Sequence, residues 1–221
     1  MSLAYAPGQS SDTSVFERCR RLLGRQGRHL RVSLAKRGLK ETAYWAAFGY
    51  LWPRRFILLS ATPNGQGVDR RDISFALWTA AEVREACRDT RRVPLELHLH
   101  QIDSVDLCVV AIASDGMLAG AIWVYRAGDP SRMFHLADGE AELNYGCVLS
   151  SYQRRGVFCD LLRFACSALP EHGIKDVYAA VHERNLRSMR AFIEAGFVPF
   201  AALRHLSFYR PKLPRWRLPA A

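Results

Sequence analysis

The sequence predicts an α/β protein in which an open mixed β-sheet carries helices on its faces. The last half of the chain alternates β-rich runs with helical stripes, which is typical of such a sheet. Ahead of this half, two apolar runs flank Ser114-Asp115-Gly116, and Asp-Gly between two such runs is a strong hairpin signal. The 221 residues are 49% hydrophobic and 24% charged, which excludes a wholly disordered or coiled-coil protein.

Apolar periodicity assigns the elements in order. Strands are expected at 55–60, 73–77, 105–113, 117–126, 143–149, 176–181 and, as one or two strands, 197–209. Helices are expected at 80–87, beginning near Thr79, and at 156–169 and 186–195, with a polar loop over 127–140. Residues 94–100 are ambiguous. In a strand His98 and His100 would share one face, and without a third ligand a surface or substrate-cleft role is favoured over a metal.

The N-terminal quarter is basic, whereas the rest of the chain is nearly neutral. Residues 1–55 hold 11 Lys and Arg against three acids, out of a net charge of +10. Residues 14–52 show a helical pattern that ends in the aromatic run 44–52, and no apolar run reaches the length of a transmembrane helix. Residues 14–55 therefore suit an acyl carrier protein or a membrane surface, while a solvated helix face and packing of the aromatics on the domain stay open.

Three regions follow from these patterns: a basic and aromatic helical extension over 1–70, an α/β domain over 71–210 and a proline-rich tail over 211–221. The six cysteines form no C-x-x-C pair, and the N-terminus has no secretory signal. We expect reduced thiols, a cytoplasmic protein that is peripheral to the membrane if residues 14–55 bind one, and no metal.

One segment carries the clearest chemistry. In Cys147–Phe158 a strand leaves the sheet, an arginine-rich turn with Gly156 follows and a helix begins. Such a turn directs several backbone N–H groups at one point, and the helix dipole adds partial positive charge. These properties predict a diphosphate site.

A second segment completes the pattern. Asn185 follows a strand, a helix comes next, and the helix ends at Gly196-Phe197. Together the two segments resemble the GNAT superfamily of acyl-CoA-dependent N-acyltransferases over residues 73–209. Gln153 and Gly156 match the family's phosphate-binding pattern, whereas Phe158 replaces its small last residue. A Phe158 ring turned into the helix–sheet core would leave the amides of the turn usable, and we expect that orientation.

The resemblance implies acetyl-CoA, or another acyl-CoA, as co-substrate and a small-molecule amine as acceptor, such as an amino sugar or an amino acid derivative. The backbone N–H of Val148 would stabilise the oxyanion. Asn185 and Ser188 would lie beside the pantetheine arm. The diphosphate would be held by the turn residues Gln153, Arg154, Arg155, Gly156, Val157 and Phe158.

The sequence offers several candidates for the base and the acid of the reaction. Some family members place a catalytic glutamate six residues before the position of Val148, which here is Glu142. In a regular strand the two would share a face, and a bulge would break that parity. Glu140 is the competing base, and a water-facing strand-edge charge is the alternative interpretation of Glu142. The tyrosine that protonates the leaving thiolate in many members is Phe192 here, so the proton donors considered are Tyr145, Tyr152 and Cys147, or the thiolate leaves unassisted.

Two other functions also suit this sequence. A longer acyl donor, on CoA or an acyl carrier protein, would suit the basic extension. A non-catalytic module that binds acyl-CoA, a membrane or a partner would suit the two phenylalanines. No nucleic-acid reader motif is visible, so no specific nucleic acid is expected. The sequence is also compatible with a homodimer.

Overall fold

The structure is a computed structural model that describes residues 54–64, 67–87, 95–98, 105–131 and 133–205, together with Gly27 and Lys40. The predictions for the basic helical segment, the aromatic run 44–52 and the tail 211–221 otherwise lie outside the described residues. In the part of the chain that is described, no helix is both long and apolar enough to cross a membrane.

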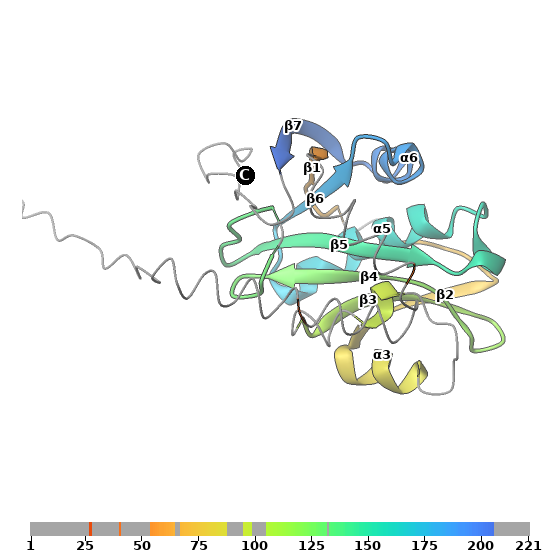
Figure 1. Cartoon of the computed structure of the whole chain (residues 1–221). Coiled ribbons are helices and arrows are strands. Elements are labelled where there is room, and N and C mark those ends of the chain that lie inside the picture. The colour runs from red at the N-terminus through yellow and green to blue at the C-terminus, as the bar shows by residue number, and fades with distance from the viewer. Residues whose placement is uncertain are drawn as a thin grey trace, which may run out of the picture.

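Seven strands form one mixed sheet in the order β2-β3-β4-β5-β6-β1-β7, as Figure 1 shows. Neighbouring strands are antiparallel except β5 and β6, which are parallel. The strands are β1 (Arg54–Ala61), β2 (Ile73–Thr79), β3 (Leu107–Ala113), β4 (Leu118–Arg126), β5 (Glu140–Val148), β6 (Asp176–His182) and β7 (Val198–His205). The helices are α3 (Ala80–Ala86), α5 (Val157–Ala168) and α6 (Leu186–Glu194), with the 3-10 turns η1 (Leu95–His98), η2 (Ser150–Tyr152) and η3 (Leu169–His172). The predicted fold class, an open mixed sheet with helices on its faces, is confirmed.

Individual elements follow the predicted ones, with a few differences. Helix α3 begins after Thr79, whose side chain and that of Glu82 form a capping box. Strand β5 starts at Glu140, ahead of the predicted start at residue 143, because the carboxylates that interrupt its apolar pattern are themselves buried. Residues 95–98, within the stretch that the sequence left ambiguous, form the 3-10 turn η1. The expected boundary at residue 71 also leaves out β1, which is hydrogen-bonded between β6 and β7 in the same sheet.

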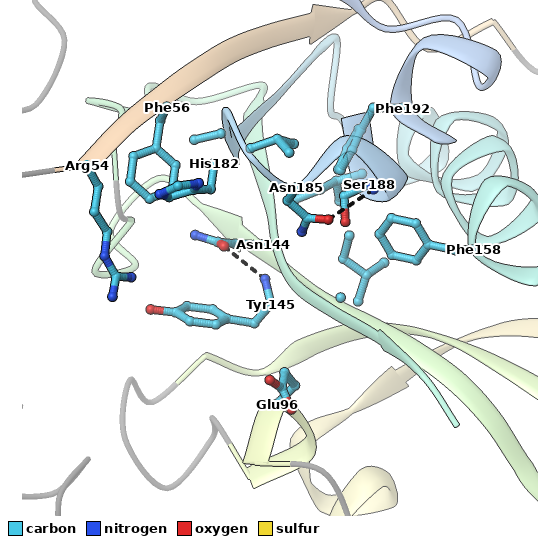
Figure 2. Close-up of a pocket in the computed structure, with 15 residues that line it drawn as sticks. Arg54, Phe56, Glu96, Asn144, Tyr145, Phe158, His182, Asn185, Ser188 and Phe192 are labelled. Carbon is cyan, nitrogen blue, oxygen red and sulfur yellow. Dashed lines mark hydrogen bonds between the residues drawn. The ribbon is translucent and has the colours of Figure 1, made fainter. Parts of the chain in front are cut away.

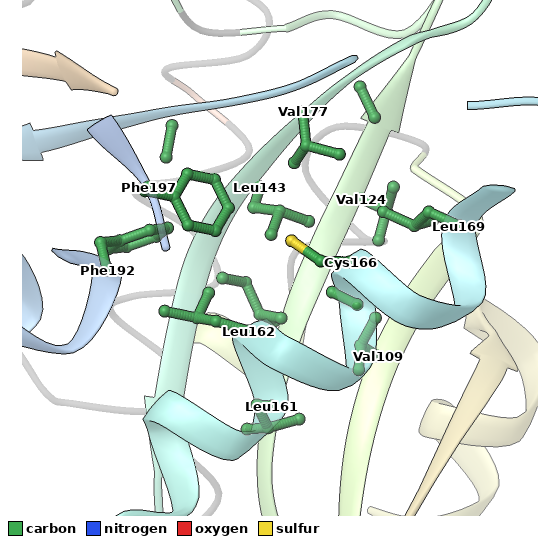
Figure 3. Close-up of a cluster of buried hydrophobic side chains, with 14 of the residues drawn as sticks. Val109, Val124, Leu143, Leu161, Leu162, Cys166, Leu169, Val177, Phe192 and Phe197 are labelled. Carbon is green, nitrogen blue, oxygen red and sulfur yellow. The ribbon is translucent and has the colours of Figure 1, made fainter. Parts of the chain in front are cut away.

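Apolar clusters cover both faces of the sheet. Helix α5 lays Leu161, Leu162 and Cys166 against strands β3 to β6, and α6 adds Phe192 to the same cluster (Figure 3). Residues of α3 and η1 pack on the other face with Trp123 of β4. Burial of these side chains supplies the main driving force for the fold.

Strands β5 and β6 separate along their length. Their paired residues run only from Glu140 to Leu143 on β5 and from Asp176 to Ala179 on β6. The second half of β5 pairs with β4 alone. An opening therefore lies between β5 and β6 beyond residue 143, and the candidate site is built around it.

Candidate active site

A β-bulge marks the start of the opening. Ala121 pairs with Cys147, whereas Trp123 pairs with Asn144, so β5 contains one more residue than β4 over this stretch. Tyr145 takes a φ of 54°, and its N–H donates to Asn144 Oδ1 at 2.9 Å. A bulge of this kind reverses the alternation of side chains after it.

The bulge corrects one expectation about β5. Leu143 and Val148 both pack in the cluster under α5, whereas Tyr145 and Cys147 pack in the cluster on the opposite face. Glu142, next to Leu143, therefore points away from the face that Val148 occupies. The expectation that Glu142 and Val148 share a face is wrong because of the inserted residue.

The backbone of Val148 faces the opening. The N–H of Leu149 donates to the carbonyl of Ala119 at 2.9 Å, so these two residues form a hydrogen-bonded pair. In an antiparallel ladder such pairs alternate with non-hydrogen-bonded ones. Val148 and Gly120 form the next pair, so the N–H and C=O of Val148 point away from β4, toward the side that β6 has left. Its carbonyl accepts from Gln153 Nε2 at 3.0 Å, which ties the strand end to the turn.

Two cavities meet at the opening. One, of about 510 Å³, is lined by residues of β1, β4, β5, β6, α5, α6 and η1. The other, of about 630 Å³, lies over the arginine-rich turn and the first residues of α5. Gly146, Phe158, Asn185 and Ser188 line both, so the cavities adjoin at these residues. We call the second the turn-side cavity and the first, after the function proposed for it, the amine-side cavity.

The turn-side cavity contains the predicted diphosphate segment. Arg154 and Gly156 adopt the left-handed conformation, with φ of 62° and 78°, and α5 begins directly afterwards. No described side chain caps this helix of 12 residues, so its first N–H groups lie at the cavity without a capping oxygen. The residues fit an anionic group, because the uncapped amides lie at the cavity together with the exposed Arg154. The predicted diphosphate residue Arg155 does not line this cavity.

Phe158 turns its ring toward the sheet. A Cβ added at Gly146 would lie 2.8 Å from Phe158 Cζ, and the ring meets Phe192 edge-on at 5.8 Å between centroids. The expectation that this ring points inward is therefore confirmed. Gly146 is the residue that makes room for it, so the missing side chain on the strand balances the large one on the helix.

Asn185 and Ser188 lie at the junction of the cavities. The Asn185 side chain caps α6 by accepting from the N–H of Ser188 at 3.2 Å, and one turn further Phe192 is buried between Phe158 and Phe197. Phe192 lies in α6, and its ring has no proton to donate.

Glu142 and Glu96 occupy different places relative to the amine-side cavity. Glu142 is fully buried, accepts from Asn144 Nδ2 at 3.1 Å and from the N–H of Met133 at 3.4 Å, and does not line the cavity. Glu96, which the sequence did not single out, does line it, below Tyr145 in Figure 2. Its position is fixed by the buried indole of Trp123, which donates to the Glu96 carbonyl at 2.6 Å.

The three candidate proton donors, Tyr145, Tyr152 and Cys147, lie in different surroundings. The Tyr145 ring lines the amine-side cavity toward Arg54, away from Phe158 and Ser188 (Figure 2). Tyr152 packs beside the helix and meets the Arg155 guanidinium at 5.9 Å. Burial raises the pKa of the Cys147 thiol well above its usual value, which makes this thiol a poorer acid. Glu140, the competing base, accepts from the N–H of Ala137 at 2.7 Å.

Two further polar residues of the amine-side cavity come from elements that the motifs do not include. His182 ends β6, and its Nδ1 accepts from the N–H of Arg184 at 3.1 Å, so a neutral ring carries its proton on Nε2. Arg54 begins β1. Sequence patterns did not indicate either residue, because the order β6-β1-β7 that brings them together is a tertiary property.

Comparison with known proteins agrees with this geometry. Residues 73–197 match the model of the acetyltransferase (GNAT) family, and the chain belongs to that family. GCN5-related N-acetyltransferase 6, chloroplastic, of Arabidopsis thaliana is 32% identical over 72 residues. That match covers 30% of this chain and 25% of the length of the relative.

Solved structures share the fold. A GNAT-family protein from Novosphingobium aromaticivorans superposes with a TM-score of 0.52 at 17% identity, over 70% of this chain and 64% of that one. A Drosophila protein superposes with a TM-score of 0.51 at 15% identity, over 75% and 54% of the two chains. At these identities the likeness establishes the fold alone.

Proposed function

We propose that the protein transfers an acyl group, acetyl in the simplest case, from acyl-CoA to the primary amine of a small molecule. The observation that carries this proposal is the meeting of two cavities beside the β5 bulge. One has the turn and helix start that suit a diphosphate, and the other has polar groups that suit an acceptor. A donor bound at the turn would reach the acceptor past Gly146.

The chain's own groups would act as follows. The N–H of Val148 faces the opening and would donate to the thioester oxygen as negative charge develops on it. The amine nitrogen forms a bond to the carbonyl carbon, the carbon–sulfur bond breaks, and the sulfur leaves as the thiolate of CoA. The amine loses a proton in the same sequence, so a base close to it is needed.

We assign that base to Glu96 rather than to Glu142. Glu96 lines the amine-side cavity, whereas both oxygens of Glu142 accept hydrogen bonds behind Asn144. Glu142 would then act through Asn144, as a positioning residue for the bulge.

Paired substitutions test the assignment. Glu96→Gln is expected to lower kcat by about 100-fold or more, the usual contribution of a positioned base, with binding of CoA unchanged. Glu142→Gln is expected to lower thermal stability and to change kcat less. Turnover would be followed as release of free CoA thiol with acetyl-CoA and a panel of primary amines. A larger kcat loss in Glu142→Gln than in Glu96→Gln, with both variants folded, would reverse the assignment.

The length of the acyl group is the second variable. Ile122, Leu143, Phe158 and Phe192 give the amine-side cavity an apolar wall, which also suits a longer chain. Comparing kcat/KM for acetyl-CoA and longer acyl-CoA donors decides between them. Binding of acyl-CoA without turnover of any amine would instead indicate a non-catalytic module.

A further inference from the structure

Arg70 connects the loop before β2 to the turn that begins α5. Its Nη1 donates to the carbonyl of Arg155 at 2.8 Å and to Asp160 Oδ2 at 3.0 Å. These contacts join residues 85 and 90 positions apart in the sequence. Arg70 lies ahead of the segment that matches the family model, and no motif in the sequence points to it.

The guanidinium is held in place from its other side. Arg70 Nε and Nη2 donate to the two oxygens of Asp72 at 2.7 and 3.2 Å. The side chain is only 17% exposed. The Asp72 pair raises the pKa of Arg70, and the guanidinium lowers the pKa of Asp72. A planar fork fixed by one carboxylate can present its remaining N–H groups in a single orientation.

One consequence concerns charge. Asp160 lies in the first turn of α5, and its carboxylate would repel an anion bound at the start of that helix. Arg70 pairs with Asp160 Oδ2 at 3.0 Å, and Arg163 approaches Oδ1 at 3.4 Å. Two arginines therefore offset the one acid beside the turn.

The other consequence concerns backbone direction. In a trans peptide the C=O and the N–H point in opposite directions. Arg70 holds the carbonyl of Arg155, so the N–H of Gly156, in the same peptide unit, points away from Arg70. Gly156 and the residues after it line the turn-side cavity.

We propose that Arg70 is a positioning residue for the diphosphate of the acyl donor, acting through the Arg155 carbonyl and the Asp160 carboxylate. This inference rests on the proposed function, because it needs the turn to bind a diphosphate. The ligand class is an acyl thioester whose carrier ends in a nucleoside diphosphate, such as acetyl-CoA.

The experiment compares Arg70→Met with Arg71→Met, a substitution of the exposed neighbour. Binding of CoA is measured by calorimetry, and KM is measured for acetyl-CoA and for acetyl-pantetheine, which lacks the nucleotide and the diphosphate. Arg70→Met is expected to weaken CoA binding by about 10-fold or more, as loss of charge-assisted hydrogen bonds implies. It is expected to leave the KM for acetyl-pantetheine unchanged, and Arg71→Met is expected to change neither value.

A second variant separates positioning from folding. Adding Asp160→Asn to Arg70→Met removes the carboxylate that has lost its Arg70 partner and is expected to restore part of the CoA affinity. Thermal unfolding is recorded for every variant. Wild-type affinity in Arg70→Met, equal losses for both donors, or no restoration in the double variant would overturn the inference. If wild type binds CoA but acylates no amine, the proposed function fails while the binding test still decides the role of Arg70. If wild type binds no CoA, both are overturned.

Discussion

The two halves of β5 differ in burial, in strand pairing and in backbone conformation. Residues 140–143 are buried and hydrogen-bonded to β4 and β6 on both sides, as in an ordinary central strand. Residues 145–148 are half-buried, begin with a bulge and have β4 as their only strand neighbour among the described strands. The first half stabilises the sheet, although Leu143 also lines the amine-side cavity. The second half presents its backbone and the side chains of Tyr145, Cys147 and Val148 to the two cavities. One strand thus divides its length between stability and binding.

The largest effect is expected in the first half. Leu143→Ala removes a side chain that is 1% exposed in the main apolar cluster. The free energy of unfolding is expected to fall by about 2–5 kcal/mol, because such a deletion loses burial and leaves a cavity. Denaturant titration measures the change. Val148→Ala is the matched variant in the second half, and a stability loss as large as that of Leu143→Ala would contradict the division.

The next effect concerns the contact between Gly146 and Phe158. Gly146→Ala places a Cβ 2.8 Å from Phe158 Cζ, so the ring has to move into one of the cavities. We expect a stability loss of about 1–3 kcal/mol, as in other overpacked sites, together with weaker binding of CoA. Thermal unfolding and calorimetry measure the two changes.

The double variant Gly146→Ala with Phe158→Ala provides the control. Removing the ring removes the clash, so stability is expected to rise above that of the single Gly146→Ala variant and CoA binding is expected to return. If the stability loss of the double variant equals the sum of the losses of the two single variants, the two residues are not coupled.

The smallest effect is expected in the turn. Arg154 has a φ of 62°, a left-handed conformation that favours glycine, and its side chain is exposed. Arg154→Gly is expected to raise the free energy of unfolding by up to about 1 kcal/mol through relief of this strain. CoA binding is expected to weaken slightly, because one cation leaves the turn. Arg155 does not have a positive φ, so Arg155→Gly serves as the control. Equal changes in the free energy of unfolding for the two variants would exclude the strain argument.

The sequence predicted what depends on local pattern. Alternation in β5, the Thr79 cap of α3 and the glycine at the start of α5 act over a few residues, and each element was assigned close to its observed place. The turn from Gln153 to Phe158 was found for the same reason, since its glycine and the helix that follows are neighbours in the chain.

What depends on register and strand order was not predicted. A single inserted residue at Tyr145 reversed the expected face of Val148 relative to Glu142, and no residue type signals such a bulge reliably. Arg54, Glu96 and His182 reach one cavity only because β1 lies beside β6 and because Trp123 fixes η1. Arg70 reaches the turn across 85 residues, a contact that no local pattern encodes.

The central claim is that the second half of β5 and the start of α5 bind the acyl donor together. Hydrogen–deuterium exchange with and without acetyl-CoA tests it most directly, because it reports on backbone amides. We predict added protection in peptides that contain Val148 and in those that contain residues 156–158, with little change in β2 and β3. Protection confined to other segments, or none at saturating acetyl-CoA, would contradict the claim.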